Sequence, residues 1–219
     1  MERHGGQARR LRHKLEHHET LRRIVGVSDF YYDPAIPPTS NEVSSMNDFK
    51  SLIRTIPDFP KPGIQFRDIT TLVQDPWGFK RAIDEFVSHY RYSPIDKVVA
   101  IESRGFIAGG ALAHHLNCGM VLARKKGKLP WLVEREEYQL EYGTDCIEIH
   151  KDAIRPGERC LIVDDLLATG GTCAATTRLV ERLGGKVVGC AFIIELAGLN
   201  GRKKIAGYDV HSLVVYEGE

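Results

Sequence analysis

The chain has 219 residues, of which 42% are hydrophobic, and carries 30 Lys and Arg against 29 Asp and Glu. This length suits one well-packed domain with an appendage, and the balanced charge gives no general reason to expect nucleic acid or a membrane as partner. No apolar run approaches the ~18 residues of a membrane span, and the five cysteines are scattered without a C-x-x-C pair. We therefore expect a cytoplasmic protein with reduced, mostly buried thiols.

The N-terminal part differs from the rest of the chain. Residues 1–23 are rich in Arg and His, and residues 34–41, Pro-Ala-Ile-Pro-Pro-Thr-Ser-Asn, have the composition of a linker. We expect a flexible basic extension over residues 1–45, either genuine or the product of an upstream start codon, and one domain over residues 46–219. The pattern at the start of this domain predicts a helix with Asn47 as N-cap. Its apolar face would hold Phe49, Leu52, Ile53 and Ile56.

Strand and helix patterns alternate through most of the domain, which is typical of an open α/β sheet. Asp75-Pro76 is expected to cap a helix whose apolar face runs from Phe79 to Tyr90. Two further helices are predicted, over residues 105–116 and 172–183. Strands are predicted over residues 97–101, 120–123, 160–163, 186–195 and 210–215. The expected fold class is α/β, with an open, mainly parallel sheet flanked by helices.

Residues 125–146 lack a clear period and contain Gly127, Pro130 and many charged side chains. This pattern predicts a long mobile loop or a hairpin. Long loops on α/β scaffolds often act as lids over a site.

The stretch 161–172, Leu-Ile-Val-Asp-Asp-Leu-Leu-Ala-Thr-Gly-Gly-Thr, joins an apolar strand to a helix N-terminus. Unpaired backbone N–H groups and the helix dipole make such a junction an anion site. Gly170 and Gly171 let the main chain approach a phosphate closely, and Thr169 and Thr172 add hydroxyl donors. The alternative is an ordinary capped turn.

Two acidic residues, Asp164 and Asp165, precede this turn. They would repel a bare phosphate, but at the carboxyl end of a strand they are placed to accept hydrogen bonds from the vicinal hydroxyls of a sugar. Turn and acids together indicate a site for a ribose phosphate, with both acids expected to be solvent-accessible.

The same stretch resembles the phosphoribosyl diphosphate motif of the type I phosphoribosyltransferases. Four more segments resemble those of the adenine phosphoribosyltransferases, in that family's order. They are residues 59–70, 102–106, 124–130 and 140–144. The resemblance runs from about residue 46 to the end, although residues 131–139 match no family pattern residue by residue.

Membership would imply the type I phosphoribosyltransferase fold, with a small hood and a flexible lid loop. It would imply transfer of the phosphoribosyl group from 5-phospho-α-D-ribose 1-diphosphate (PRPP) to adenine, giving AMP and diphosphate. It would also imply Mg²⁺ as cofactor and a homodimer. We expect Mg²⁺ to be held by substrate oxygens and water, with no direct protein ligand, because the sequence offers no carboxylate cage beyond the Asp pair.

The resemblance assigns roles to individual residues. The ribose 5-phosphate site would comprise Asp164, Asp165, Ala168, Thr169, Gly170, Gly171 and Thr172. The diphosphate site would comprise Ser103, Arg104, Arg124, Lys125 and Lys128, with a cis peptide between Glu102 and Ser103. Adenine would stack on Phe66 and be read by the main chain at Gln65 and Arg67. The catalytic residues would be Glu141, Tyr142, Asp164 and Asp165.

Each role has a simpler alternative. Arg104 could form a surface salt bridge, and residues 124–128 could be a solvated run of charge. Phe66 could be a core residue, while Glu141 and Tyr142 could be exposed loop residues. The identity of the group that donates a proton to the purine stays open.

Two other functions were weighed. A phosphoribosyltransferase for hypoxanthine or guanine usually carries a base-reading lysine near its last strands, and none is evident at residues 193–196. A PRPP-sensing regulator would need a DNA-binding part, for which residues 1–45 are short and poorly patterned.

Overall fold

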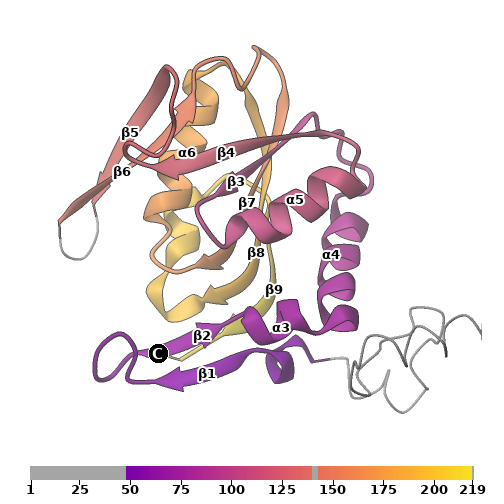
Figure 1. Ribbon diagram of the computed structural model, residues 1–219, viewed down its shortest axis with the longest axis vertical. Coiled ribbons are helices and arrows are strands. Elements are labelled where there is room, and N and C mark those ends of the chain that lie inside the picture. Colours follow the sequence, from indigo (N-terminus) through magenta and orange to yellow (C-terminus); the bar gives the residue numbers. More distant parts are fainter. Residues whose placement is uncertain (1–47, 140–142, 219) are drawn as a thin grey trace, which may run out of the picture. The chain divides into compact units, whose positions relative to one another are not determined.

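The computed structural model describes residues 48–139 and 143–218. A sheet of seven strands runs through it in the order β5-β6-β4-β3-β7-β8-β9 (Figure 1). The strands are β3 (Lys97–Ile101), β4 (Gly119–Lys125), β5 (Val133–Gln139), β6 (Thr144–His150), β7 (Arg159–Leu167), β8 (Lys186–Leu196) and β9 (Val210–Tyr216). Strands β4, β3, β7, β8 and β9 pair in parallel. At one edge, β6 pairs antiparallel with β4 and with β5. The predicted α/β fold with a mainly parallel sheet is confirmed.

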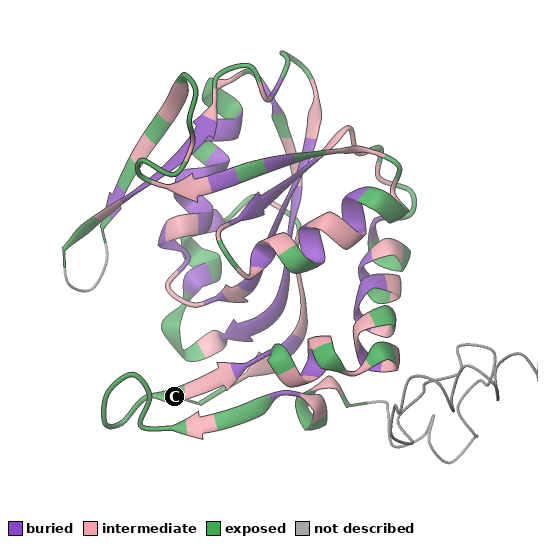
Figure 2. Ribbon diagram, viewed as in Figure 1, coloured by how far each residue is buried: buried purple, intermediate pink, exposed green. Residues whose placement is uncertain are grey.

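Helices cover both faces of this sheet, so its central strands are buried on both sides (Figure 2). They are α3 (Thr70–Gln74), α4 (Pro76–Tyr90), α5 (Gly105–His115) and α6 (Gly171–Arg182). Leu161 and Val163 of β7 pack with α4 and α5, whereas Ile162 packs with α6 on the opposite face. Alternate residues of a strand point to opposite faces, which explains why β7 requires a continuous apolar run. None of the described helices is long and apolar enough to cross a membrane.

Helix boundaries follow local signals. The Asp75 side chain accepts a hydrogen bond of 2.5 Å from the Gly78 N–H, and Pro76 is the first residue of α4, as predicted. At the end of α6, Gly184 has φ +89° and the Gly185 N–H donates to the Val180 carbonyl at 2.9 Å. This is the arrangement that a glycine stop favours.

A smaller sheet of two antiparallel strands forms the predicted hood, with β1 (Arg54–Pro57) paired to β2 (Gln65–Asp68). The helix predicted near residue 46 is wrong. The chain forms only a 3₁₀ turn, η1 (Phe49–Leu52), which is capped by Asp48, and Asn47 lies outside the described residues. Ile56 lies in β1, opposite Phe66 of β2. Tertiary pairing therefore overrides an apolar spacing that also fits a helix.

Residues 125–146 contribute to a hairpin, which is one of the two predicted outcomes. Strands β5 and β6 pair from Val133 opposite His150 to Gln139 opposite Thr144. Strand β6 pairs with β4 at only two positions, Arg124 with Glu148 and Lys125 with Ile147. Most of the hairpin therefore depends on other contacts for its position.

Candidate active site

The turn between β7 and α6 has the geometry of an anion site. Gly170 has φ +74° and is the N-cap of α6, which has no capping side chain. A Cβ on Gly170 would lie 2.4 Å from the Gly201 carbonyl oxygen, so only glycine fits there. The first N–H groups of α6 are consequently left for an anion rather than for a side-chain cap.

The acidic pair lies deeper than predicted. Strand β7 continues to Leu167, so Asp164 and Asp165 are within it, where Asp164 pairs with Phe192 of β8. Asp164 is half-buried and Asp165 is buried, so the expectation of two exposed acids is wrong for Asp165. Burial, followed by the charge of Asp165, raises the pKa of Asp164 well above its usual range.

The turn that carries the predicted diphosphate residues Ser103 and Arg104 lies against this pair. The Glu102–Ser103 peptide is cis, as predicted, and α5 begins at Gly105. A Cβ on Gly105 would lie 2.8 Å from the Val163 carbonyl oxygen and 2.9 Å from Asp164 Oδ1. Because Gly105 has no Cβ, the turn after β3 can pack directly against Val163 and Asp164 of β7.

Arg104 connects three of the predicted subsites. Its Nε lies 2.6 Å from Asp165 Oδ2, and its guanidinium carbon lies 5.1 Å from the centre of the Phe66 ring. Among the described residues, that buried Asp165 oxygen has no aligned hydrogen-bond donor, so the contact is an ion pair only. A buried acceptor of this kind suits a ligand hydroxyl. The salt bridge of Arg104 thus joins two site residues rather than two surface residues.

Two of the other predicted diphosphate cations, Arg124 and Lys125, are held by acids that the sequence did not single out. Arg124 donates from Nε and Nη2 to the two Glu102 carboxylate oxygens, each at 3.1 Å, and from Nη1 to the Lys128 carbonyl at 2.9 Å. Although burial opposes ionisation, these bonds lower the pKa of Glu102. Glu102 therefore fixes Arg124 beside Ser103. Glu102 could have been found from the sequence, because it immediately precedes the predicted diphosphate residue Ser103.

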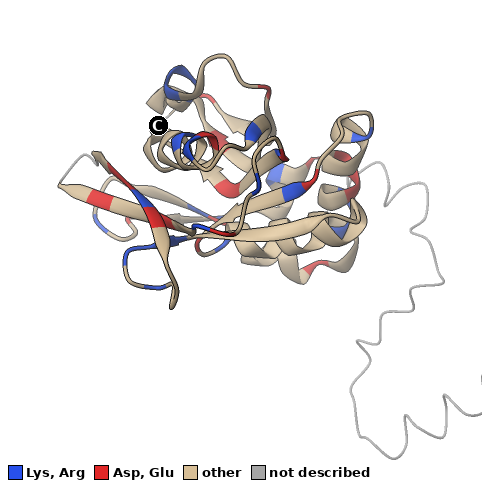
Figure 3. Ribbon diagram, turned by 90° about the horizontal axis from the view of Figure 1, so that it is seen from above, with Lys and Arg blue, Asp and Glu red and all other residues tan. Residues whose placement is uncertain are grey.

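Lys125 points toward the hairpin instead. Its Nζ donates to the Tyr138 hydroxyl at 2.7 Å and pairs with Asp145. Burial disfavours the ammonium, but these hydrogen bonds raise the pKa of Lys125 above its ordinary value. No sequence spacing predicts this pair, because it depends on how β4 and β6 align. Figure 3 shows that basic and acidic residues are interspersed over the described part of the chain, so neighbouring pairs of opposite charge are frequent.

The predicted adenine residues lie on β2. Phe66 is half-buried, belongs to neither core cluster, and stacks edge to face on Phe59 with ring centres 5.1 Å apart. The core alternative for Phe66 is thereby excluded. Gln65 is exposed, and the Arg67 side chain contacts Thr55 and the Tyr216 ring. Among the described residues, β2 has a partner strand on one edge only, so alternate main-chain groups face away from β1.

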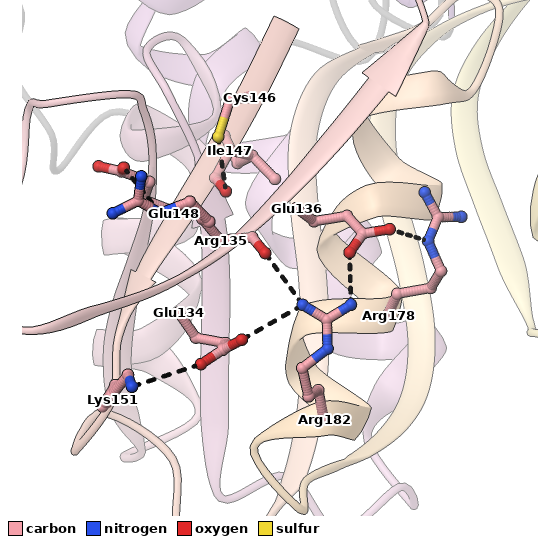
Figure 4. A network of polar contacts seen from close by, with 9 residues as sticks. All are labelled: Glu134, Arg135, Glu136, Cys146, Ile147, Glu148, Lys151, Arg178 and Arg182. Atoms are coloured by element: carbon pink, nitrogen blue, oxygen red, sulfur yellow. Dashed lines mark hydrogen bonds and ion pairs between the residues drawn. The ribbon is translucent and has the colours of Figure 1, made fainter.

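The hairpin is clamped to α6 by ion pairs (Figure 4). Arg178 donates to Glu136 at 2.6 Å, and Arg182 donates to the other Glu136 oxygen and to the Arg135 carbonyl. Burial opposes ionisation of Glu136, but the two arginines lower its pKa. Arg182 also pairs with Glu134 at 3.4 Å, so two carboxylates of β5 fix the hairpin to the helix that begins at the phosphate turn.

Comparisons with known proteins agree with this geometry. The family model of the phosphoribosyl transferase domain matches residues 75–216. The adenine phosphoribosyltransferase of Ruegeria pomeroyi is 56% identical over 178 residues, which cover 80% of this chain and 99% of that protein. The chain belongs to the adenine phosphoribosyltransferase family. It is accordingly a pentosyltransferase of purine salvage that makes AMP and diphosphate from adenine and PRPP.

Solved structures of the family have the same fold. The Rhodothermus marinus adenine phosphoribosyltransferase is 56% identical, with a TM-score of 0.76 over 80% of this chain and 99% of that chain. The Trypanosoma brucei enzyme, in complex with AMP, pyrophosphate and ribose-5-phosphate, is 27% identical, with a TM-score of 0.71 over 76% of this chain and 77% of that chain. The family's predicted catalytic pair, Glu141 and Tyr142, lies outside the described residues.

Proposed function

We propose that PRPP binds across the two anion turns while adenine stacks against the hood, so that the reacting atoms meet beside Arg104. The observation that carries this proposal is the contact of Arg104 with both Asp165 and Phe66. In the Trypanosoma brucei relative, AMP, pyrophosphate and ribose-5-phosphate occupy one complex. Two of these species, AMP and diphosphate, are the products proposed for this chain.

In the proposed reaction, N9 of adenine displaces diphosphate from the anomeric carbon through an oxocarbenium-like transition state. The C–O bond to diphosphate breaks, a C–N bond forms, and the N9 proton leaves the purine. Arg104 and Arg124 stabilise the departing negative charge. Asp164 and Asp165 accept hydrogen bonds from the ribose hydroxyls and stabilise positive charge on the sugar. Glu141 is proposed to handle the purine proton and Tyr142 to cover the reacting centre.

Mg²⁺ is proposed as the cofactor. Among the described residues, no group of three or more His, Cys, Asp or Glu side chains could hold a metal ion. We expect the ion to be carried by the hydroxyl and diphosphate oxygens of PRPP and by water, because Mg²⁺ prefers such oxygen ligands. When bound, Mg²⁺ would neutralise negative charge on the leaving diphosphate.

We also propose that the enzyme is a cytoplasmic homodimer. Ile107 of α5 and Met120 and Leu122 of β4 are exposed apolar residues. A Cβ on Gly110 of α5 would lie 3.8 Å from the Met120 sulfur, so this helix and strand form one surface. An exposed apolar surface of this kind suits a second copy of the chain. The cytoplasmic assignment is supported by five free cysteines, of which four are buried.

Phe66→Ala is expected to raise KM for adenine by about 10- to 100-fold, because base–aromatic stacking contributes roughly 1–3 kcal/mol. KM for PRPP should change little. Gln65→Ala is the matched control, since the proposed reading at Gln65 uses the main chain, and it should leave KM for adenine within about twofold of the parent. Steady-state kinetics measure both variants. An unchanged KM for adenine in Phe66→Ala would contradict the stacking role.

A chain that starts at Met46 is expected to keep its activity and its dimeric mass. The family model matches residues 75–216 and the aligned relatives match about 80% of this chain, which supports an active domain that does not need the basic N-terminal extension. Initial rates and sedimentation of the shortened chain, beside the full chain, provide the test. Loss of activity or of folding would show that residues 1–45 belong to the domain.

A further inference from the structure

The proposed 5-phosphate site has no cationic side chain of its own. Its turn, residues 168–172, consists of Ala, Thr, Gly, Gly and Thr, and it follows two acidic residues. A phosphate monoester carries a charge of about −1.5 to −2 at pH 7, whereas a helix N-terminus offers only about +0.5. Backbone donors alone therefore leave much of the phosphate charge uncompensated, and the site calls for a cation from another part of the chain.

Lys204 lies beside this turn. Its Nζ is 3.9 Å from the position that a Cβ on Gly171 would occupy. Lys204 and Gly171 line one cavity of about 470 Å³, together with residues of the hairpin and Arg178. The described part of the chain contains no ion pair to Lys204, whereas Arg178 is bound to Glu136. Glu137 also lines the cavity, but in the described part of the chain Lys204 is the cation there that forms no ion pair with a carboxylate.

The element that carries Lys204 is fixed to the turn. It is the 3₁₀ helix η3 (Gly201–Ile205), and a Cβ on Gly201 would lie 2.2 Å from the Ala168 carbonyl oxygen. Arg202 donates twice to the buried Glu195, at 2.6 Å each, and Ile205 is buried in the core. These contacts hold the backbone of η3 against the phosphate turn, so the reach of Lys204 is set by its side chain alone.

We propose that Lys204 is a further binding residue for the 5-phosphate of PRPP and AMP, supplying the charge that the turn lacks. The inference rests on the proposed placement of the phosphate at residues 168–172. The ammonium group would swing from the cavity to a phosphate oxygen, a short movement for a flexible four-carbon side chain. A charge-assisted bond of this kind is worth about 1.5–3 kcal/mol, which corresponds to roughly 10- to 100-fold in affinity.

Lys204→Gln is therefore expected to raise KM for PRPP by at least about tenfold and to leave kcat and KM for adenine within about twofold of the parent. Lys203→Gln is the matched control, because Lys203 is the adjacent exposed lysine of the same 3₁₀ helix. It should leave all three parameters unchanged. Lys204→Arg keeps the charge and should recover most of the affinity for PRPP.

Calorimetric titrations of the parent chain and of each variant with AMP and with adenosine isolate the phosphate. Lys204→Gln should weaken AMP binding about tenfold and leave adenosine binding unchanged, because adenosine lacks the phosphate. Equal AMP affinities in Lys204→Gln and Lys203→Gln would overturn the inference, as would equal losses for AMP and adenosine. Failure of the parent chain to form AMP would instead overturn the proposed function, and titration with ribose 5-phosphate would still decide the role of Lys204.

Discussion

Replacing Asp164 and Asp165 together by asparagine is expected to lower kcat/KM for PRPP by about 10³-fold, the range seen when preorganised electrostatic groups are removed from an active site. Both carboxylates lie in the C-terminal half of β7, and Asp165 has a buried oxygen without an aligned donor among the described residues. The asparagines could still accept hydrogen bonds from the ribose hydroxyls. They would lose the negative charge that stabilises the oxocarbenium-like sugar.

The fold should survive this double change, because asparagine has nearly the same size and shape as aspartate. The buried Asp165 does pair with Arg104, so a modest fall in melting temperature is expected. Initial rates with varied PRPP and a thermal melt measure the two effects separately. Asp84→Asn, which changes a half-buried acid of α4 that pairs with Lys80, is the control for lost charge. Near-parental kinetics in a folded double variant would remove the ribose assignment.

The largest expected effect is on the choice of base, where adenine should exceed hypoxanthine in kcat/KM by about 10⁴-fold or more. Adenine presents an amino donor at C6 and an acceptor at N1, which one backbone C=O and one N–H can satisfy. Hypoxanthine and guanine present the reverse pair. In a desolvated pocket each wrong base would leave two polar groups unpaired.

Strand β2 is suited to this reading because it has an unpaired edge. Gln65 and Arg67 are two residues apart, so their main-chain groups point in the same direction, while Phe66 projects between them. Because the proposed reading of the base uses the main chain, Gln65→Ala should keep the preference for adenine. Comparable kcat/KM values for adenine and hypoxanthine would refute backbone reading, even in an active phosphoribosyltransferase.

Several elements could be predicted from the sequence because local signals and packing agree. The Asp75-Pro76 cap set the start of α4, and the apolar run after Asp96 gave β3 its observed bounds, Lys97–Ile101. The two glycine-bearing turns were found because close backbone packing leaves room only for glycine at Gly105 and Gly170. These signals act within a few residues and can be read without the fold.

Other features depend on contacts that no local pattern encodes. Strand β7 was predicted to end at Val163 because Asp164 interrupts the apolar run, yet pairing with β8 continues to Leu167. Likewise, the spacing of Ile53 and Ile56 fits a helix, but pairing with β2 makes residues 54–57 a strand. Asp145 is 20 positions from its partner Lys125. Such partners are brought together only by strand register.

The central claim is that this chain converts adenine and PRPP into AMP. The direct measurement is product analysis after incubating the purified full chain with PRPP, Mg²⁺ and each purine base in turn. The account predicts one AMP and one diphosphate per adenine consumed, loss of that activity when EDTA removes Mg²⁺, and negligible product from hypoxanthine or guanine. Absence of AMP from adenine, or ready conversion of hypoxanthine to its nucleotide, would contradict it.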